Sequence, residues 1–316
     1  MVFIDIVIFI VSLTLLIISA NTLVKSSSSL AKVLRVPEFI IGLTVVSVGT
    51  SIPELATSIV AAIKQNSEII TGTIIGSNIA NIGLILGIAS IMVPIELKKK
   101  KFSLDSIFLV FISITLFILS LDQKIKWTEG LFFLLLFIAY ISLLIKRSRK
   151  SEYVHLEENI VRHKISFFKN ILTILFSFAF LYLGAEYLVK SASLIASIFG
   201  ISEETIALTM IAVGTSLPEL FVTLSSARQH KVSILMGNII GSNISNTLLI
   251  FGSAAVISPI ILSSFDVFIM LPIMITVSLL LYNFIKTTWF SRVLEGVLFL
   301  FFYLIFVLTI ILLAPA

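Results

Sequence analysis

Apolar runs of about twenty residues recur along the whole chain, and this feature constrains the fold more than any other. A helix of about twenty residues is the length that crosses the hydrocarbon core of a bilayer. The chain has 316 residues, of which 58% are hydrophobic and only 12% are charged. Ordinary soluble domains carry about twice that charged fraction. We therefore predict an all-α polytopic membrane protein.

Ten transmembrane helices are predicted, with boundaries approximate to a few residues. They lie near residues 2–20, 38–63, 69–95, 103–121, 127–146, 166–190, 203–227, 232–260, 264–285 and 292–313. No basic residue precedes the first apolar run, so we expect a retained helix there rather than a signal peptide. The absence of cysteine excludes disulfides and thiolate metal sites.

Basic residues gather on one side of this arrangement. With ten spans, 18 of the 22 Lys and Arg residues fall on the same side of the membrane. Positive charge concentrates in cytoplasmic connections, so we predict that this side is cytoplasmic, that both termini lie outside, and that the protein resides in the plasma membrane. Topology also accounts for the net charge of +5, and we expect membrane lipid, but no nucleic acid, as a partner.

The two halves of the chain match each other. Sliding the sequence by 165 positions gives a gapless correspondence between residues 20–95 and 185–260. Each half contains five spans, an odd number, so the second half enters the membrane from the opposite side. Inverted repeats of this kind occur in many secondary transporters that bind substrate at the midplane. We predict a single transport domain, with a first repeat at 1–146, a cytoplasmic linker at 147–165 and a second repeat at 166–316.

A glutamate beside a proline is the central element of each repeat. The sequence VGTSIPEL at 48–55 recurs as VGTSLPEL at 213–220. Glu54 is the only charged residue between positions 39 and 63, and Glu219 is the only one between 205 and 227. An ionisable side chain inside a membrane span indicates a functional site by default. Pro53 and Pro218 each remove a backbone donor, which frees carbonyl groups that a cation can satisfy.

Small polar side chains accompany both carboxylates. Those in the Pro-Glu segments lie on or beside the helical face of the glutamate, namely Ser47, Thr50, Ser51, Ser58, Thr215, Ser216 and Thr223. Those in the uncharged spans that follow recur every four residues, namely Thr73, Ser77, Asn81, Asn238, Ser242 and Asn246. The G-x-x-x-G spacing in the same spans allows close helix approach. Interhelical hydrogen bonding would explain these hydroxyls and amides, but not two carboxylates without a basic partner.

The candidate ligands are all oxygen atoms, which disfavours soft transition metals. Calcium takes about six to eight oxygen ligands at flexible geometry, and two carboxylates balance its charge. Sodium also accepts carbonyl and hydroxyl oxygens, so the two ions could compete for the same residues. Competition of that kind would couple the two fluxes. We predict no enzyme activity, no catalytic residue and no cofactor.

The paired motifs carry a family resemblance. Both copies of G-T-S-x-P-E-L, each followed by G-x-x-x-G-S-N-I-x-N, resemble the paired α-repeats of the sodium/calcium exchanger family within the cation/calcium antiporter superfamily. The short central linker resembles that of prokaryotic members. The resemblance implies electrogenic exchange, commonly of three sodium ions for one calcium ion. It also implies alternating access, in which the first and sixth helices slide past the other eight.

The resemblance further implies a set of ligands. For Ca²⁺ they are Glu54 and Glu219 with the backbone carbonyls of Thr50 and Thr215. For the flanking Na⁺ sites they are Ser51, Ser77, Ser216 and Ser242 with the carbonyls of Ser47 and Ala212. The middle site is lined by Asn81 and Asn246. Well-known members carry an aspartate at the position of Asn246, so the site here holds two carboxylates and the sodium stoichiometry stays open.

Two alternatives remain open at this stage. A proton/calcium antiporter of the same superfamily fits because carboxylates also bind protons, although those proteins usually carry a G-N-x-x-E motif. A cation channel is the more distant alternative, since channels usually assemble a pore from several subunits. This chain completes its own pseudo-two-fold pair, and we therefore expect a monomer.

Overall fold

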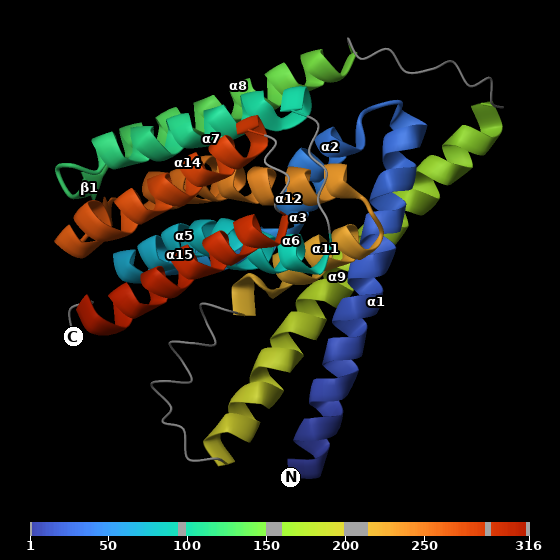
Figure 1. Ribbon diagram of the computed structural model, residues 1–316, viewed down its shortest axis with the longest axis horizontal. Coiled ribbons are helices and arrows are strands. Elements are labelled where there is room, and N and C mark those ends of the chain that lie inside the picture. The colour runs from blue at the N-terminus through green and yellow to red at the C-terminus, as the bar shows by residue number, and fades with distance from the viewer. Residues whose placement is uncertain (1, 94–98, 150–159, 199–213, 288–291, 314–316) are drawn as a thin grey trace.

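The computed structural model describes residues 2–93, 99–149, 160–198, 214–287 and 292–313, and nearly all of these residues are helical (Figure 1). Within these ranges eight helical segments are long and apolar enough to cross a membrane. A helix pair bent by 47°, Glu38–Thr50 and Ile52–Ile63, makes a ninth candidate span. The span expected at 203–227 begins outside the described residues, so the count of ten stays a prediction.

The helices follow the chain in this order. The first half contains α1 (Val2–Leu34), α2 (Glu38–Ile41), α3 (Ser47–Thr50), α4 (Ile52–Ile63), α5 (Ser67–Ala80), α6 (Gly87–Met92), α7 (Lys99–Leu119) and α8 (Trp127–Arg149). The second half contains α9 (Ile160–Ile198), α11 (Leu217–Arg228), α12 (Val232–Ser245), α13 (Phe251–Ile257), α14 (Leu271–Thr287) and α15 (Arg292–Leu313). Four π-helical segments adjoin them, η1 (Gly42–Val46), η2 (Asn81–Leu86), η3 (Asn246–Ile250) and η4 (Asp266–Met270).

Two helices run well past their predicted ends. The first was expected near 2–20 but α1 continues to Leu34, and the sixth was expected near 166–190 but α9 spans Ile160–Ile198. A helix satisfies its own backbone groups, so a polar stretch such as 25–29 need not end it where the hydrocarbon ends. The linker predicted at 147–165 is shortened at both ends, because α8 reaches Arg149 and α9 begins at Ile160.

The continuous spans of α5–α6 and α12–α13 form the centre of the molecule. They are 78% and 83% buried, whereas the span of α15 is only 17% buried. Two glycines bring α12 close to the segment 39–47. A Cβ atom at Gly237 would lie 2.7 Å from the carbonyl oxygen of Phe39, and one at Gly241 would lie 2.6 Å from Ser47 Oγ. The close approach expected from the G-x-x-x-G spacing is therefore present on α12.

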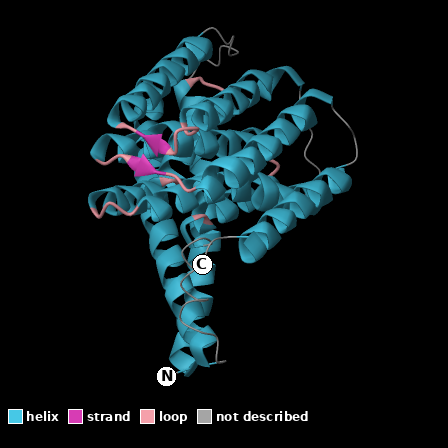
Figure 2. Ribbon diagram, turned by 90° about the vertical axis from the view of Figure 1, so that its left-hand side faces the viewer, coloured by secondary structure: helices cyan, strands magenta, loops and turns pink. Residues whose placement is uncertain are grey.

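Helices α1 and α9 form a pair at one side of the bundle (Figure 1). Their apolar residues form a cluster of their own together with parts of α2, η1, α11 and α12. Two loops are joined by a short antiparallel ladder, β1 (Lys124–Ile125) with β2 (Ile260–Ile261), the two magenta strands in Figure 2. This ladder corrects the all-α expectation in a small way: backbone groups in these loops lack helical partners and pair with each other.

Candidate cation site

Two helix breaks position the site. α3 ends at Thr50 and α4 begins at Ile52, and Ser51 between them has φ −86° and ψ 11°. Ser216 precedes α11 with nearly the same angles, φ −88° and ψ 2°. Pro53 and Pro218 occupy the first turn of the new helices, where a residue without an N–H is tolerated. Each break is therefore followed by a glutamate in the first turn of the new helix, one residue after the proline.

The two glutamates lie in the interior and interact with each other's helices. Both are only 1% exposed. Ser51 Oγ donates to Glu219 Oε1 over 3.0 Å, and the Thr50 side chain is a further polar neighbour of Glu219. In return, Glu54 accepts a hydrogen bond from the Thr215 side chain, and the two carboxylates interact electrostatically. The two breaks thus build one site, each supplying a carboxylate to the hydroxyls of the other.

Both carboxylates keep an oxygen without a partner. Oε2 of Glu54 and Oε2 of Glu219 are buried and make no hydrogen bond. Among the described residues, none of the ion pairs includes either glutamate. A buried charge that lacks a counter-charge is costly, and a bound cation would supply one. We therefore read this as a cation site.

The central helices add neutral oxygens. Ser77 Oγ of α5 lies 3.2 Å from Ser216 Oγ at the second break. Further buried oxygens without partners belong to Ser242 Oγ, Asn81 Oδ1 and Asn246 Oδ1. Asn81 and Asn246 begin η2 and η3, and π-helical turns often mark functional positions. Oxygen ligands of these kinds suit sodium and calcium better than transition metals.

The structure describes one of the two carbonyl ligands predicted for the Na⁺ sites, that of Ser47. The carbonyl oxygen of Ser47 already accepts from Thr50 Oγ1 at 3.1 Å and from the backbone N–H of Ser51 at 3.1 Å. Because both lone pairs of this oxygen already accept hydrogen bonds, it can coordinate an ion directly only when one of these bonds breaks. Ala212, its counterpart in the second repeat, lies outside the described residues.

Several polar contacts at the site were not among the predicted ligands. Asn238 accepts from Thr50 Oγ1 at 3.2 Å and donates to Thr223 Oγ1 at 3.2 Å, so it holds the first break against α11. Asn243 accepts from Asn81 Nδ2 at 3.4 Å, and Asn78 donates to Thr247 Oγ1 at 2.9 Å. Asn78 and Asn243 occupy the same place in the two copies of G-S-N-I-x-N, which is the sequence signal that could have identified them.

Comparison with known proteins gives consistent results. The sequence profile of the family described as sodium/calcium exchanger protein matches residues 4–146 and 169–312. The chain is 36% identical to sodium/calcium exchanger MaX1 of Methanosarcina acetivorans, over 89% of this chain and 91% of that protein. It is 34% identical to the membrane protein MJ0091 of Methanocaldococcus jannaschii, over 87% of each. A solved structure of the sodium-calcium exchanger NCX_Mj, soaked with Na⁺, superimposes with a TM-score of 0.87 at 31% identity, covering 99% of this chain and 100% of that one.

Proposed function

Because the chain belongs to the sodium/calcium exchanger protein family, we propose that it exchanges Na⁺ for Ca²⁺ across the plasma membrane by alternating access. Membership of this family supports cation/Ca²⁺ exchange rather than enzyme activity. One observation carries the choice of ions: Glu54 and Glu219 are buried, close together, and each retains an oxygen without a partner. Two carboxylates balance one Ca²⁺, and neutral oxygens around them suit Na⁺.

We assign the ligands as follows. Ca²⁺ is bound by the side chains of Glu54 and Glu219 and the backbone carbonyls of Thr50 and Thr215. Na⁺ is bound by Ser51, Ser77, Ser216 and Ser242, with the carbonyls of Ser47 and Ala212. Asn81 and Asn246 line the middle of the site. The bond from Ser51 to Glu219 and the Ser77–Ser216 contact support a shared site, in which occupation by one ion displaces the other.

The wider architecture follows from the same proposal. Two inverted repeats of five helices, the first ending with α8 at Arg149 and the second beginning with α9 at Ile160, are joined by the linker between these helices, with both termini outside the cell. The similar breaks at Ser51 and Ser216, and the π-helical segments that begin at Asn81 and Asn246, support the internal repetition. The pair α1 and α9 slides past the other helices to alternate access. The functional unit is a monomer.

A flux measurement tests the proposal. In proteoliposomes, an imposed Na⁺ gradient will drive Ca²⁺ uptake against its own gradient, and a pH gradient alone will not. Uptake driven by the pH gradient instead identifies a proton/calcium antiporter, and flux without any counter-ion identifies a channel. The membrane potential at which net flux reverses gives the number of Na⁺ ions exchanged for each Ca²⁺. This number shows how many sodium ions a site with two carboxylates binds in each transport cycle.

A further inference from the structure

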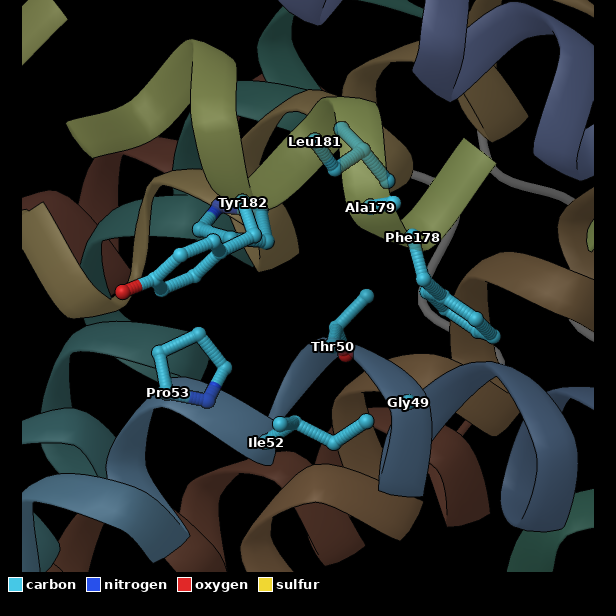
Figure 3. A pocket seen from close by; sticks show the side chains of 9 residues that line it. Gly49, Thr50, Ile52, Pro53, Phe178, Ala179, Leu181 and Tyr182 are labelled. Atoms are coloured by element: carbon cyan, nitrogen blue, oxygen red, sulfur yellow. The ribbon is translucent and has the colours of Figure 1, made fainter. Parts of the chain in front are cut away.

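The pair α1 and α9 contacts the rest of the molecule through many apolar side chains. Leu23 of α1 and Leu181 of α9 belong to one apolar cluster with Val222 of α11. At the first helix break, Phe178 and Leu181 of α9 line a cavity on the side opposite Thr50 (Figure 3). Apolar contacts are non-directional, so they do not by themselves fix the position of the pair along its neighbours.

A polar contact joins α1 to α11. Ser225 Oγ donates to Asn21 Oδ1 at 2.7 Å and accepts from Gln229 Nε2 at 2.8 Å. Gln229 Nε2 also lies 3.3 Å from the backbone oxygen of Asn21. Ser225 is only 5% exposed. Because hydrogen bonds require a defined distance and angle, this contact fixes the position of α1 along α11.

The contact lies between the cation site and one side of the membrane. On α11, Ser225 follows Glu219 by six residues, which is about 9 Å along a helix axis. Gln229 directly follows the last residue of that helix. This end of α11 carries Arg228 and precedes Lys231, so it lies on the side that we predict to be cytoplasmic. Helix α1 is therefore bound to α11 between Glu219 and the cytoplasm.

A second polar contact lies further along the same face of α1. Ser28 follows Asn21 by seven residues, or about two helical turns. Its hydroxyl donates to Glu38 Oε1 at the start of α2, and Lys231 Nζ, directly before α12, lies 2.8 Å from the same oxygen. Hydrogen bonds thus connect this part of α1 to three of the helices around the site.

We propose that Asn21, Ser225 and Gln229 form a latch that holds α1 on α11 and keeps the cytoplasmic side of the cation site closed. This inference rests on the sliding of α1 and α9 in the proposed function. A shift of α1 along α11 by one helical turn, about 5.4 Å, breaks all three contacts. Because the three side chains are neutral, opening the latch leaves no buried charge without its partner.

Cross-linking tests whether the latch must open during transport. Since the chain contains no cysteine, the double variant Asn21→Cys/Ser225→Cys carries only two thiols. A bifunctional methanethiosulfonate with a short spacer joins them through two disulfides. We expect this treatment to abolish Na⁺-driven Ca²⁺ uptake in proteoliposomes, and a reducing agent to restore it. Each single variant, treated with the same reagent, should retain its uptake.

Thiol modification tests the latch without a transport measurement. Val222 is fully buried in the apolar cluster beside α1, so Val222→Cys places a thiol that water reaches only when the pair moves. We expect Asn21→Leu, which cannot form the hydrogen bonds of the asparagine side chain, to increase severalfold its rate of modification by a charged methanethiosulfonate in inverted membrane vesicles. The control Thr22→Val removes a hydrogen bond within α1, to the carbonyl oxygen of Ile18 at 2.8 Å, and should leave the rate unchanged.

The outcomes separate the latch from the proposed function. Unchanged uptake after complete cross-linking would overturn the latch, and so would equal modification rates with and without Asn21→Leu. Absence of Na⁺-driven uptake in the unmodified protein contradicts sodium/calcium exchange instead, and the modification rates then still decide whether the latch exists.

Discussion

Buried carboxylates occur in two different settings in this protein. Asp105 on α7 is fully buried and accepts hydrogen bonds from Tyr140 Oη at 3.0 Å and from Arg147 Nη1 and Nη2 at 3.0 and 3.3 Å. Glu54 and Glu219 are buried to the same degree, yet their partners are hydroxyl groups, and each keeps an oxygen without a hydrogen bond.

This difference separates a structural carboxylate, Asp105, from the two carboxylates that we propose bind cations. The charge of Asp105 is balanced within the protein, so this group needs no ligand and fixes α7 against α8. The charges of Glu54 and Glu219 are balanced only when a cation is present, and leaving a buried charge without a partner is costly. Burial alone therefore does not distinguish the two kinds of carboxylate. Within the described part of the chain a basic partner does, and its absence at Glu54 and Glu219 supports the proposed ion site.

Removal of either of the two carboxylates that we propose bind Ca²⁺ should have the largest effect on transport. Glu54→Gln and Glu219→Gln keep the shape of the side chain but halve the negative charge available to Ca²⁺. We expect a loss of Na⁺-driven Ca²⁺ uptake greater than the roughly 10- to 100-fold cost of removing groups that only orient metal ligands. The measurement is the initial uptake rate over a range of Ca²⁺ concentrations in proteoliposomes.

The matched control for these variants is Glu186→Gln. Glu186 forms an exposed i,i+4 pair with Lys190 at 2.6 Å on α9, and surface pairs of this kind contribute little. Uptake by this variant should equal that of the unmodified protein. Retention of full uptake by Glu54→Gln would contradict the assignment of the site.

Disruption of the structural carboxylate should lower stability while leaving ion preference intact. Asp105→Asn removes the charge that holds Arg147. Breaking a fully buried pair costs about 3–5 kcal/mol, and here we expect about 2–3 kcal/mol because the Arg147 side chain is 42% exposed and partly screened. The measurements are thermal unfolding in detergent and the ratio of Na⁺ to Ca²⁺ affinity. A changed affinity ratio at unchanged stability would reverse the roles assigned to the two kinds of carboxylate.

The sequence alone singles out the two carboxylates that we propose bind cations, but not the structural carboxylate Asp105. Glu54 and Glu219 stand out because each is alone in an apolar run and occupies the same place in a repeated motif. Asp105 and Arg147 are 42 positions apart, and Asn21 bonds Ser225 across 204 positions. Periodicity predicts which face of a helix is polar, but it does not specify which neighbouring helix that face meets. Contacts of this kind depend on packing and could not be derived from the pattern.

A third carboxylate introduced into the proposed site should increase its affinity for Ca²⁺. Asn246 is buried with Oδ1 unpartnered, and Asn246→Asp adds negative charge among the proposed ligands. We expect apparent Ca²⁺ affinity to increase about tenfold, which corresponds to 1.4 kcal/mol, and to become more dependent on pH because the new group can bind a proton. Binding isotherms from pH 5 to 9 measure both effects. Identical isotherms for variant and parent would show that Asn246 does not face the ions.

Loss of the neutral positioning residue Asn238 should have the smallest effect. Its carboxamide bonds Thr50 and Thr223 at 3.2 Å each, so it orients the first break without binding an ion itself. Asn238→Ala removes both bonds, each of which contributes about 0.5–1.5 kcal/mol to stability. Because Asn238 acts on the ions only through Thr50, we expect apparent Ca²⁺ affinity to fall only severalfold while the maximal rate changes less. Asn238→Thr, which borrows Thr73 from the matching position of the first repeat, keeps a hydroxyl and should recover part of the loss. A fall in thermal stability with unchanged ion affinity would show instead that Asn238 acts only in packing, as Asp105 does.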